Sequence, residues 1–162
     1  MRIDDELYKL AVALGRAALE RGVRIATAES CTGGLVAGVI TAVAGSSDWF
    51  DSGFITYSNE AKIGQLAVPR AIIEQFGAVS EETALSMAQG ALGASSAQWA
   101  IAVTGIAGPA GGTLDKPVGT VCFAWVGPGF AKGSRTRLDG DRAAIRRESV
   151  RIALEGVLDR LA

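Results

Sequence analysis

Histidine is absent from this sequence of 162 residues. Without histidine the chain cannot form a Ser-His-Asp or Cys-His catalytic arrangement, and no histidine-ligated metal site is possible. The two cysteines, Cys31 and Cys122, are too few for a zinc site and fit reduced thiols better than a disulfide framework. If the chain is a hydrolase, its general base must be a lysine, a tyrosine, an aspartate or a glutamate.

The sequence also has no excess of positive or of negative charge. The formal net charge is −1, which argues against a bulk electrostatic nucleic-acid binder. The longest apolar stretch, residues 36–44, is too short to span a bilayer, and residues 1–6 show no signal-peptide pattern. We therefore expect a cytoplasmic protein that binds neither nucleic acid nor membrane. The length and the 49% of apolar residues predict one domain over residues 1–162.

Hydrophobic periodicity and turn residues predict alternating strands and helices in the first half of the chain. This order favours an α/β fold with a mostly parallel sheet covered on both faces. A Gly-Pro-Gly turn at 127–129 predicts a late hairpin, so at least one strand is antiparallel. The predicted strands are 23–28, 53–58, 99–103, 118–126 and 130–138, and the predicted helices are 5–21, one after Gly34, 59–66, 69–76, one opened by Ser80, and 141–161.

The segment 27–34 reads Thr-Ala-Glu-Ser-Cys-Thr-Gly-Gly, where a strand ends and a helix begins. Free N–H groups at such a turn bind anions, glycines let a ligand approach, and Ser30 would be exposed at the carboxyl edge of the sheet. The alternative is that Ser30 or Thr32 only caps the helix and the glycines serve packing. The string is neither a P-loop nor a G-x-S-x-G elbow. Cys31 is a nucleophile in principle, but without histidine a spectator thiol is favoured.

A second constellation, residues 57–62, lies at the end of the second predicted strand and contains Tyr57 and Lys62. A lysine can act as a base for serine if burial lowers its pKa toward neutrality. The alternatives are a solvated helix lysine and an ordinary strand aromatic. The spacing is one residue off the Tyr-x-x-x-Lys of short-chain dehydrogenases, and no G-x-G-x-x-G fingerprint accompanies it, so hydride transfer is rejected.

Two further segments carry candidate contacts. The glycine-rich loop that begins with Val-Thr-Gly at 103–105 follows a strand, where functional loops commonly lie, although a flexible connection would look the same. Arg142, at the start of the last helix, could grip a phosphate bidentately. It could equally be one exposed arginine among several, because Arg146, Arg147 and Arg151 follow on the same element.

Taken together, the order and spacing of these motifs closely resemble the CinA C-terminal domain family, whose stand-alone members are nicotinamide-nucleotide amidases of pyridine-nucleotide recycling. The resemblance covers nearly the whole chain. The matching strings are T-A-E-S-C-T-G-G-L at 27–35, G-S-S at 45–47, G-x-I-x-Y-S-N-x-x-K at 53–62, A-V-S at 78–80, V-T-G-I-A-G-P at 103–109, K-P-V-G-T-V at 116–121 and G-D-R at 140–142.

The resemblance implies a three-layer α/β/α domain around a mixed sheet of about five strands. It also implies cleavage of the carboxamide of nicotinamide mononucleotide to nicotinate mononucleotide and ammonia. Ser30 matches the family's nucleophile, and Tyr57 and Lys62 match the residues that assist it. One departure is Ala110, where the family commonly has glycine; a positive φ there would strain alanine. The implied substrate contacts are Thr32, Gly33, Gly34, Ser47, Thr104, Gly105 and Arg142.

The mechanism expected from these residues uses neutral Lys62, helped by Tyr57, to take the proton from Ser30. Backbone N–H groups near Gly33 or after Thr104 would stabilise the oxyanion, and the substrate's phosphate would lie on a helix N-terminus. No cofactor and no metal are expected, the partner is a small pyridine nucleotide, and the chain is expected to form a homo-oligomer, a dimer foremost. The rival hypothesis is a non-catalytic nucleotide-binding or regulatory module of the same fold.

Overall fold

The computed structural model describes residues 3–162, so the first two residues of the predicted domain lie outside the described residues. The strands are β1 Ile25–Glu29, β2 Phe50–Ile55, β3 Trp99–Gly105, β4 Thr120–Gly127 and β5 Phe130–Arg137. The helices are α1 Asp5–Arg21, α2 Leu35–Thr41, α3 Asn59–Leu66, α4 Arg70–Phe76, α5 Glu81–Gly93 and α6 Arg142–Leu161, with a short 3-10 helix at Ser46–Asp48.

The five strands form one sheet in the order β2-β1-β3-β4-β5. β1 pairs in parallel with both β2 and β3, whereas β4 is antiparallel to β3 and to β5. Four strands therefore run in one direction and β4 runs against them, which confirms the mixed, mostly parallel sheet. The same edge of the sheet receives the carboxyl ends of β1, β2, β3 and β5.

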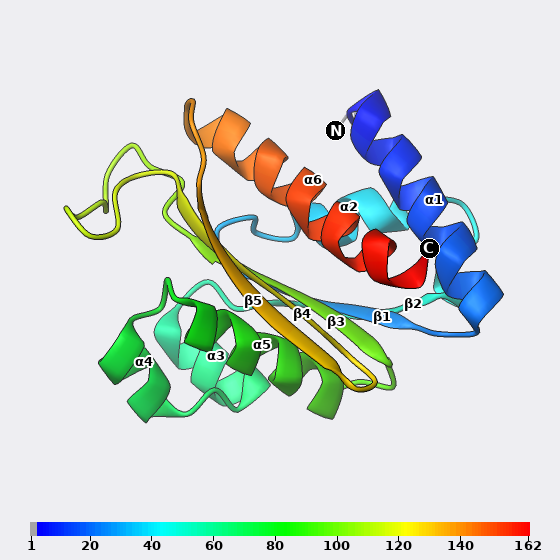
Figure 1. The fold of residues 1–162 in the computed structure, drawn as a ribbon, viewed down its shortest axis with the longest axis horizontal. Helices are drawn as coiled ribbons and strands as arrows, with labels where there is room; N and C mark the ends of the chain where they lie inside the picture. Colours follow the sequence, from blue (N-terminus) through cyan, green and yellow to red (C-terminus); the bar gives the residue numbers. More distant parts are fainter. Residues whose placement is uncertain (1–2) are drawn as a thin grey trace.

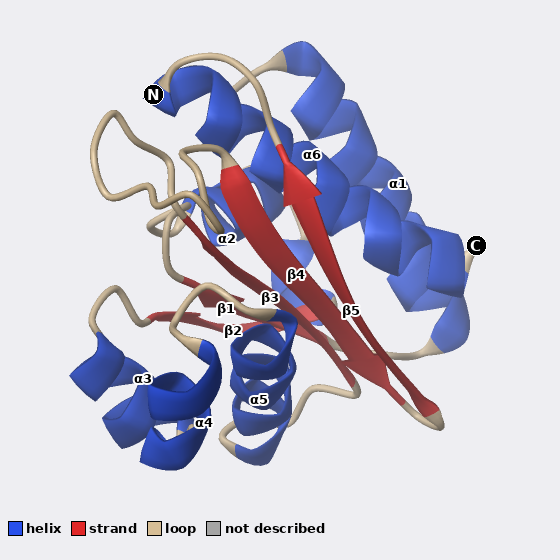
Figure 2. Ribbon diagram, turned by 60° about the vertical axis from the view of Figure 1, so that its left-hand side comes forward, coloured by secondary structure: helices blue, strands red, loops and turns tan. Residues whose placement is uncertain are grey.

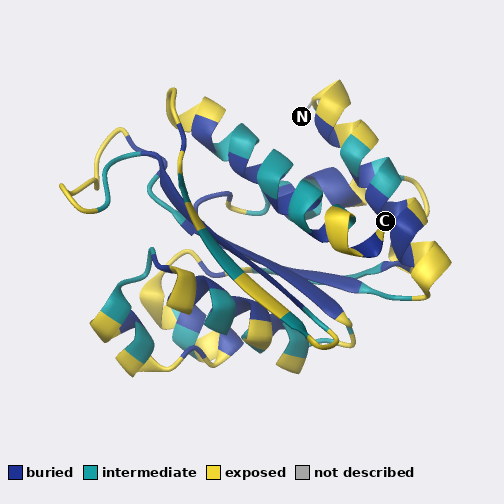
Figure 3. Cartoon of the chain, in the orientation of Figure 1, coloured by how far each residue is buried: buried dark blue, intermediate teal, exposed yellow. Residues whose placement is uncertain are grey.

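Helices cover both faces of this sheet, as the α/β order of the sequence predicts. α1, α2 and α6 pack on one face and α3, α4 and α5 on the other (Figures 1 and 2). The central strands β1, β3 and β4 are buried along nearly their whole length (Figure 3). The result is the three-layer α/β/α architecture that the resemblance implies. Within residues 3–162, no helix has both the length and the apolar character needed to cross a membrane.

Local signals explain most of the element boundaries. Asp4 accepts hydrogen bonds from the N–H groups of Glu6 and Leu7, and Gly22 ends α1 with a φ of 62°. Ser80 caps α5 through the N–H of Thr83, as predicted. Each of these residues supplies the hydrogen bond or the backbone conformation that a helix end requires.

Several boundaries differ from the sequence-based expectation: β1 begins at Ile25 and not at Val23, β3 extends to Gly105 and not only to Val103, and β4 begins at Thr120 and not at Val118. β2 spans Phe50–Ile55 and not the predicted 53–58, a shift of three residues at both ends, because this edge strand is only half-buried and lacks a continuous apolar run. The loop between β3 and β4 has its positive φ angles at Gly108, Gly111 and Gly119, not at Ala110. Alanine therefore fits its position in this loop without backbone strain.

Candidate active site

The candidate site forms where several chain segments leave the same edge of the sheet. Ser30 directly follows β1, and Tyr57 comes two residues after β2. Thr104 is the last residue but one of β3. β5 runs parallel to β3, so the chain that leaves it enters α6 at Arg142 beside this edge. Parallel strands thus bring together residues that are far apart in the sequence, as expected for a ligand site in an α/β sheet.

Ser30 and Lys62 are in direct contact at this edge. The Nζ atom of Lys62 lies 3.1 Å from the Oγ atom of Ser30, and it donates a second hydrogen bond of 2.8 Å to the carbonyl oxygen of Thr56. Lys62 is only 1% exposed and Ser30 8% exposed. A nucleophile and a base within hydrogen-bond distance are the minimum requirement for an activated serine.

Burial sets the protonation chemistry of this pair. Removal of the Lys62 amine from water lowers its pKa from the ordinary value of 10.5, because desolvation disfavours the charged form. No carboxylate forms an ion pair with Lys62 among the described residues. Lys62 is therefore better suited to accept a proton from Ser30 than an exposed lysine would be.

The turn after Ser30 is held from inside the protein by Glu29. One oxygen of the buried Glu29 carboxylate accepts hydrogen bonds from the hydroxyl of Thr32 at 2.6 Å and the N–H of Val36 at 2.9 Å, and the other oxygen accepts from the N–H of Ala37 at 3.0 Å. The N-terminus of α2 is thus occupied by the protein's own carboxylate. The N–H groups of Val36 and Ala37 are therefore already bonded and are not free for the phosphate of a ligand.

Beside Ser30 and Lys62 lies a cavity of about 240 Å³. Cys31 lies in its wall, and burial raises the pKa of the Cys31 thiol to about 12, so this group is a thiol at neutral pH and not a nucleophile. A Cβ atom on Gly105 would lie 3.1 Å from the Cys31 sulfur, which explains a glycine at this point of the wall. The lining residues are Ser30, Cys31, Tyr57, Asn59, Lys62, Ala78, Val79, Thr104, Gly105, Ala107 and Arg142.

Tyr57 and Arg142 form the mouth of the cavity. One Nη atom of Arg142 donates to the Tyr57 hydroxyl oxygen at 3.0 Å, and the other donates to the carbonyl oxygen of Gly108 at 2.9 Å. The sequence-based mechanism has Tyr57 assisting Lys62, but the structure gives the Tyr57 hydroxyl a different partner. With Tyr57 61% exposed, this pair is accessible to a ligand that enters from solvent.

Six of the ten predicted site residues line this one cavity: Ser30, Tyr57, Lys62, Thr104, Gly105 and Arg142. The Thr104 hydroxyl donates to the carbonyl oxygen of Ala78 at 2.8 Å. This bond holds the segment with Ala78 and Val79 in the cavity wall.

The remaining four predicted residues lie elsewhere. Thr32 is fully buried against Glu29, and the turn glycines Gly33 and Gly34 are not part of the lining. Ser47 precedes β2 and its carbonyl oxygen accepts from Arg24, which precedes β1, so Ser47 lies at the opposite edge of the sheet.

Sequence reasoning did not single out three residues of this region. Glu29 could have been noticed as a lone carboxylate at the end of an apolar strand, just before a helix. Arg146 lies one helical turn after Arg142, a spacing that places both on one face of α6. Asn59 lines the cavity from the start of α3 and had no signal beyond its place in the Tyr-Ser-Asn string. In the part of the chain that the structure describes, no group of three or more potential metal ligands occurs.

Comparison with known proteins gives consistent matches over nearly the full chain. The family model described as "CinA C-terminal domain" matches residues 7–161. The nicotinamide-nucleotide amidohydrolase PncC of Pseudomonas putida is 48% identical over 154 residues, covering 95% of this chain and 96% of that protein. PncC of Escherichia coli K12 is 50% identical over 155 residues, covering 94% and 93%. The crystal structure of the competence/damage inducible protein CihA from Agrobacterium tumefaciens superposes with a TM-score of 0.95 at 44% identity, covering 98% of both chains.

Proposed function

This chain belongs to the CinA C-terminal domain family, and we propose that it hydrolyses the carboxamide of nicotinamide mononucleotide to nicotinate mononucleotide and ammonia. The observation that carries the proposal is the 3.1 Å contact between Lys62 Nζ and Ser30 Oγ beside a cavity, in a chain without histidine. The names of the PncC relatives support the choice of substrate.

Acylation begins with proton transfer from Ser30 to neutral Lys62. The Ser30 oxygen then forms a bond to the carboxamide carbon. Backbone N–H groups of the turn after Ser30, or of the loop after Thr104, stabilise the oxyanion. When the carbon–nitrogen bond breaks, Lys62 returns the proton to the leaving nitrogen, which departs as ammonia.

Deacylation reverses these roles. Water attacks the ester carbon, Lys62 accepts a proton from this water, and the bond between the carbon and Ser30 breaks. Lys62 then gives the proton back to the Ser30 oxygen. The nucleotide is released as a carboxylic acid, which loses its remaining proton to water and becomes the carboxylate. The cycle needs one titrating base and consumes one water, so the proposed reaction uses no cofactor.

The cavity suggests how the substrate lies. At about 240 Å³ it is smaller than typical ligand pockets, which span roughly 300–1,000 Å³, so the ring and carboxamide would fill it and the ribose phosphate would extend to the mouth. Arg142 there offers a guanidinium for the phosphate. The exposed ring of Tyr57 can stack on the cationic pyridinium. We assign Tyr57 to substrate binding at the mouth, because its hydroxyl contacts Arg142.

The experiment that tests this proposal incubates the purified protein with nicotinamide mononucleotide and measures both ammonia and nicotinate mononucleotide. We expect equal amounts of the two products, unchanged activity after exhaustive chelation, and much poorer turnover of free nicotinamide because it lacks the phosphate. Tight binding of the nucleotide without ammonia release would instead favour the non-catalytic module, and loss of activity on chelation with recovery on one added metal would contradict the metal-free mechanism.

A further inference from the structure

Arg146 of α6 contacts the turn that follows Ser30. Its Nε atom donates to the carbonyl oxygen of Cys31 at 3.1 Å, and an Nη atom donates to the carbonyl oxygen of Thr32 at 3.2 Å. One planar guanidinium thus holds two successive carbonyl groups. Arg146 itself is not among the residues that line the catalytic cavity.

This contact adds a restraint to a glycine-rich part of the chain, beside those from Glu29 and from the turn's own backbone bonds. Gly33 and Gly34 have φ angles of 58° and 95°, and glycine populates many backbone conformations. The turn has two backbone hydrogen bonds of its own, from the N–H of Gly33 to the carbonyl oxygen of Ser30 at 3.0 Å and from the N–H of Leu35 to that of Thr32 at 3.1 Å. Because a trans peptide is planar, fixing the carbonyls of Cys31 and Thr32 also fixes the directions of the N–H groups that follow them.

We propose that Arg146 is a positioning residue, which sets the geometry of the Ser30 turn without touching the substrate; this inference rests on the proposed function. Arg146 holds the carbonyl groups of Cys31 and Thr32, and the Glu29 carboxylate holds the Thr32 hydroxyl, so both restrain the backbone that follows Ser30. A lysine at position 146 could reach one carbonyl but not both, because it lacks the planar fork of donors. The arginine thereby couples α6 to the nucleophile.

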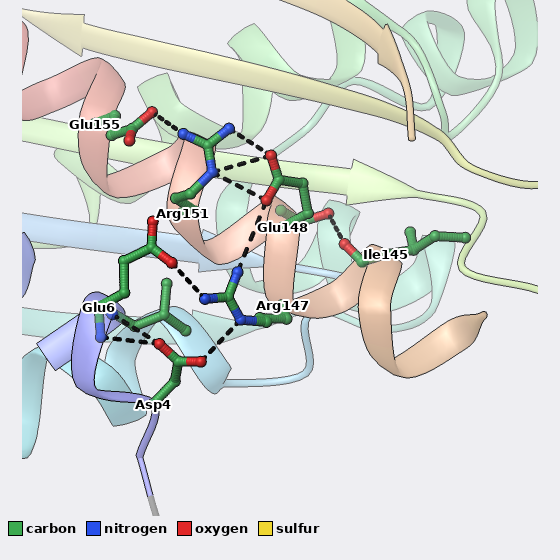
Figure 4. A network of polar contacts seen from close by, with 9 residues as sticks. Asp4, Glu6, Ile145, Arg147, Glu148, Arg151 and Glu155 are labelled. Carbon is green, nitrogen blue, oxygen red and sulfur yellow. Dashed lines mark hydrogen bonds and ion pairs between the residues drawn. The ribbon is translucent and has the colours of Figure 1, made fainter. Parts of the chain in front are cut away.

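The test compares Arg146→Ala and Arg146→Lys with a matched control, Arg147→Ala. Arg147 is the next residue on α6, but it bonds to Asp4 and Glu6 at the surface instead of the turn (Figure 4). Exposed ion pairs of this kind contribute little to stability, so the control should fold and retain wild-type kcat.

For Arg146→Ala we expect kcat to fall by roughly 10- to 100-fold, the size of effect that follows a small misplacement of reacting groups. KM should stay within about threefold of wild type, because the phosphate contact at Arg142 is untouched. The kcat of Arg146→Lys should lie between that of the wild type and that of Arg146→Ala. Guanidinium ion at a non-denaturing concentration should restore part of the activity of Arg146→Ala, whereas sodium chloride at equal ionic strength should not. A groove of about 210 Å³ beside Arg146, lined also by Leu35, Val39 and Val150, gives this small cation access.

Wild-type kcat in either folded Arg146 variant would overturn the inference. So would a loss of activity that appears wholly in KM, or one that guanidinium does not relieve in a variant whose thermal unfolding matches wild type. If Arg146→Ala fails to fold, Arg146→Lys alone decides between the outcomes. A wild-type protein that releases no ammonia would defeat the proposed function instead, so the two failures are distinguishable.

Discussion

Replacement of the buried base by an unbranched apolar side chain that lacks the terminal amine, Lys62→Met, should change how stability depends on pH. Burial lowers the pKa of Lys62 in the folded protein, whereas in the unfolded chain the amine titrates near 10.5. Between these two pKa values the unfolded chain binds a proton that the folded protein does not. The free energy of unfolding of the wild type therefore rises with pH across this window, and below the folded-state pKa the burial penalty is fully present.

The magnitude follows from proton linkage. Within the window the stability of the wild type gains up to about 1.4 kcal/mol per pH unit relative to Lys62→Met, which has no group to titrate there. The absolute difference at one pH is less informative. Loss of the bond to the Thr56 carbonyl leaves a buried acceptor without its partner, which costs about 1–3 kcal/mol and partly cancels the removed burial penalty.

Urea denaturation of both proteins at a series of pH values from neutrality upward measures this slope. Other titrating groups are common to both proteins and cancel in the difference. Lys132→Met, which removes an exposed lysine of β5, is the matched control. Its difference in unfolding free energy from the wild type should not change with pH. Parallel stability curves for the wild type and Lys62→Met would show that Lys62 does not change its proton affinity on folding, and the argument for a neutral base would fail.

Four other substitutions have defined outcomes. Glu29→Gln replaces a carboxylate that accepts three hydrogen bonds by an amide whose NH₂ cannot accept, so unfolding in urea should show a loss of about 1–3 kcal/mol; unchanged stability would contradict its role in the turn. Tyr57→Phe should raise KM several-fold with little change in kcat, because the hydroxyl contacts Arg142; a fall of about 100-fold in kcat would instead place that hydroxyl in proton transfer. Ala67 and Gly22 both have a left-handed backbone, with φ angles of 53° and 62°, and no atom would crowd a Cβ at Gly22. In thermal unfolding, Ala67→Gly should therefore stabilise the protein and Gly22→Ala should destabilise it, each by about 0.5–1 kcal/mol. Stability changes of the same sign would refute the backbone argument.

Much of the fold follows from local patterns in the sequence. α1 occupies residues 5–21, as its apolar periodicity and Gly22 predict, and α3 spans the predicted 59–66. β2 was harder to place because it is an edge strand with one neighbour, so its residues alternate irregularly between half-buried and exposed positions. Strand pairing sets this boundary, and pairing is a property of the whole sheet.

Part of the candidate site could be predicted from the order and direction of the strands. Ser30 and Lys62 each follow a strand that points toward the carboxyl edge, so their approach follows from topology. Ser47 precedes a strand, and the same reasoning would have placed it at the other edge. The partner of Tyr57 could not be predicted, because it depends on where the N-terminus of α6 lies after the chain leaves β5. The role of Glu29 depends on side-chain geometry within a turn, which no spacing rule specifies.

The most direct test of the central claim is ammonia release from nicotinamide mononucleotide by Ser30→Ala, Lys62→Ala and the double variant. We expect each single variant to lose at least about 100-fold in turnover, since a nucleophile and its base act as one unit. The double variant should be little worse than the poorer single one. Near-normal turnover in a folded Ser30→Ala protein would contradict the covalent mechanism. Near-normal turnover in Lys62→Ala, or losses that multiply in the double variant, would contradict the assignment of Lys62 as the base for Ser30.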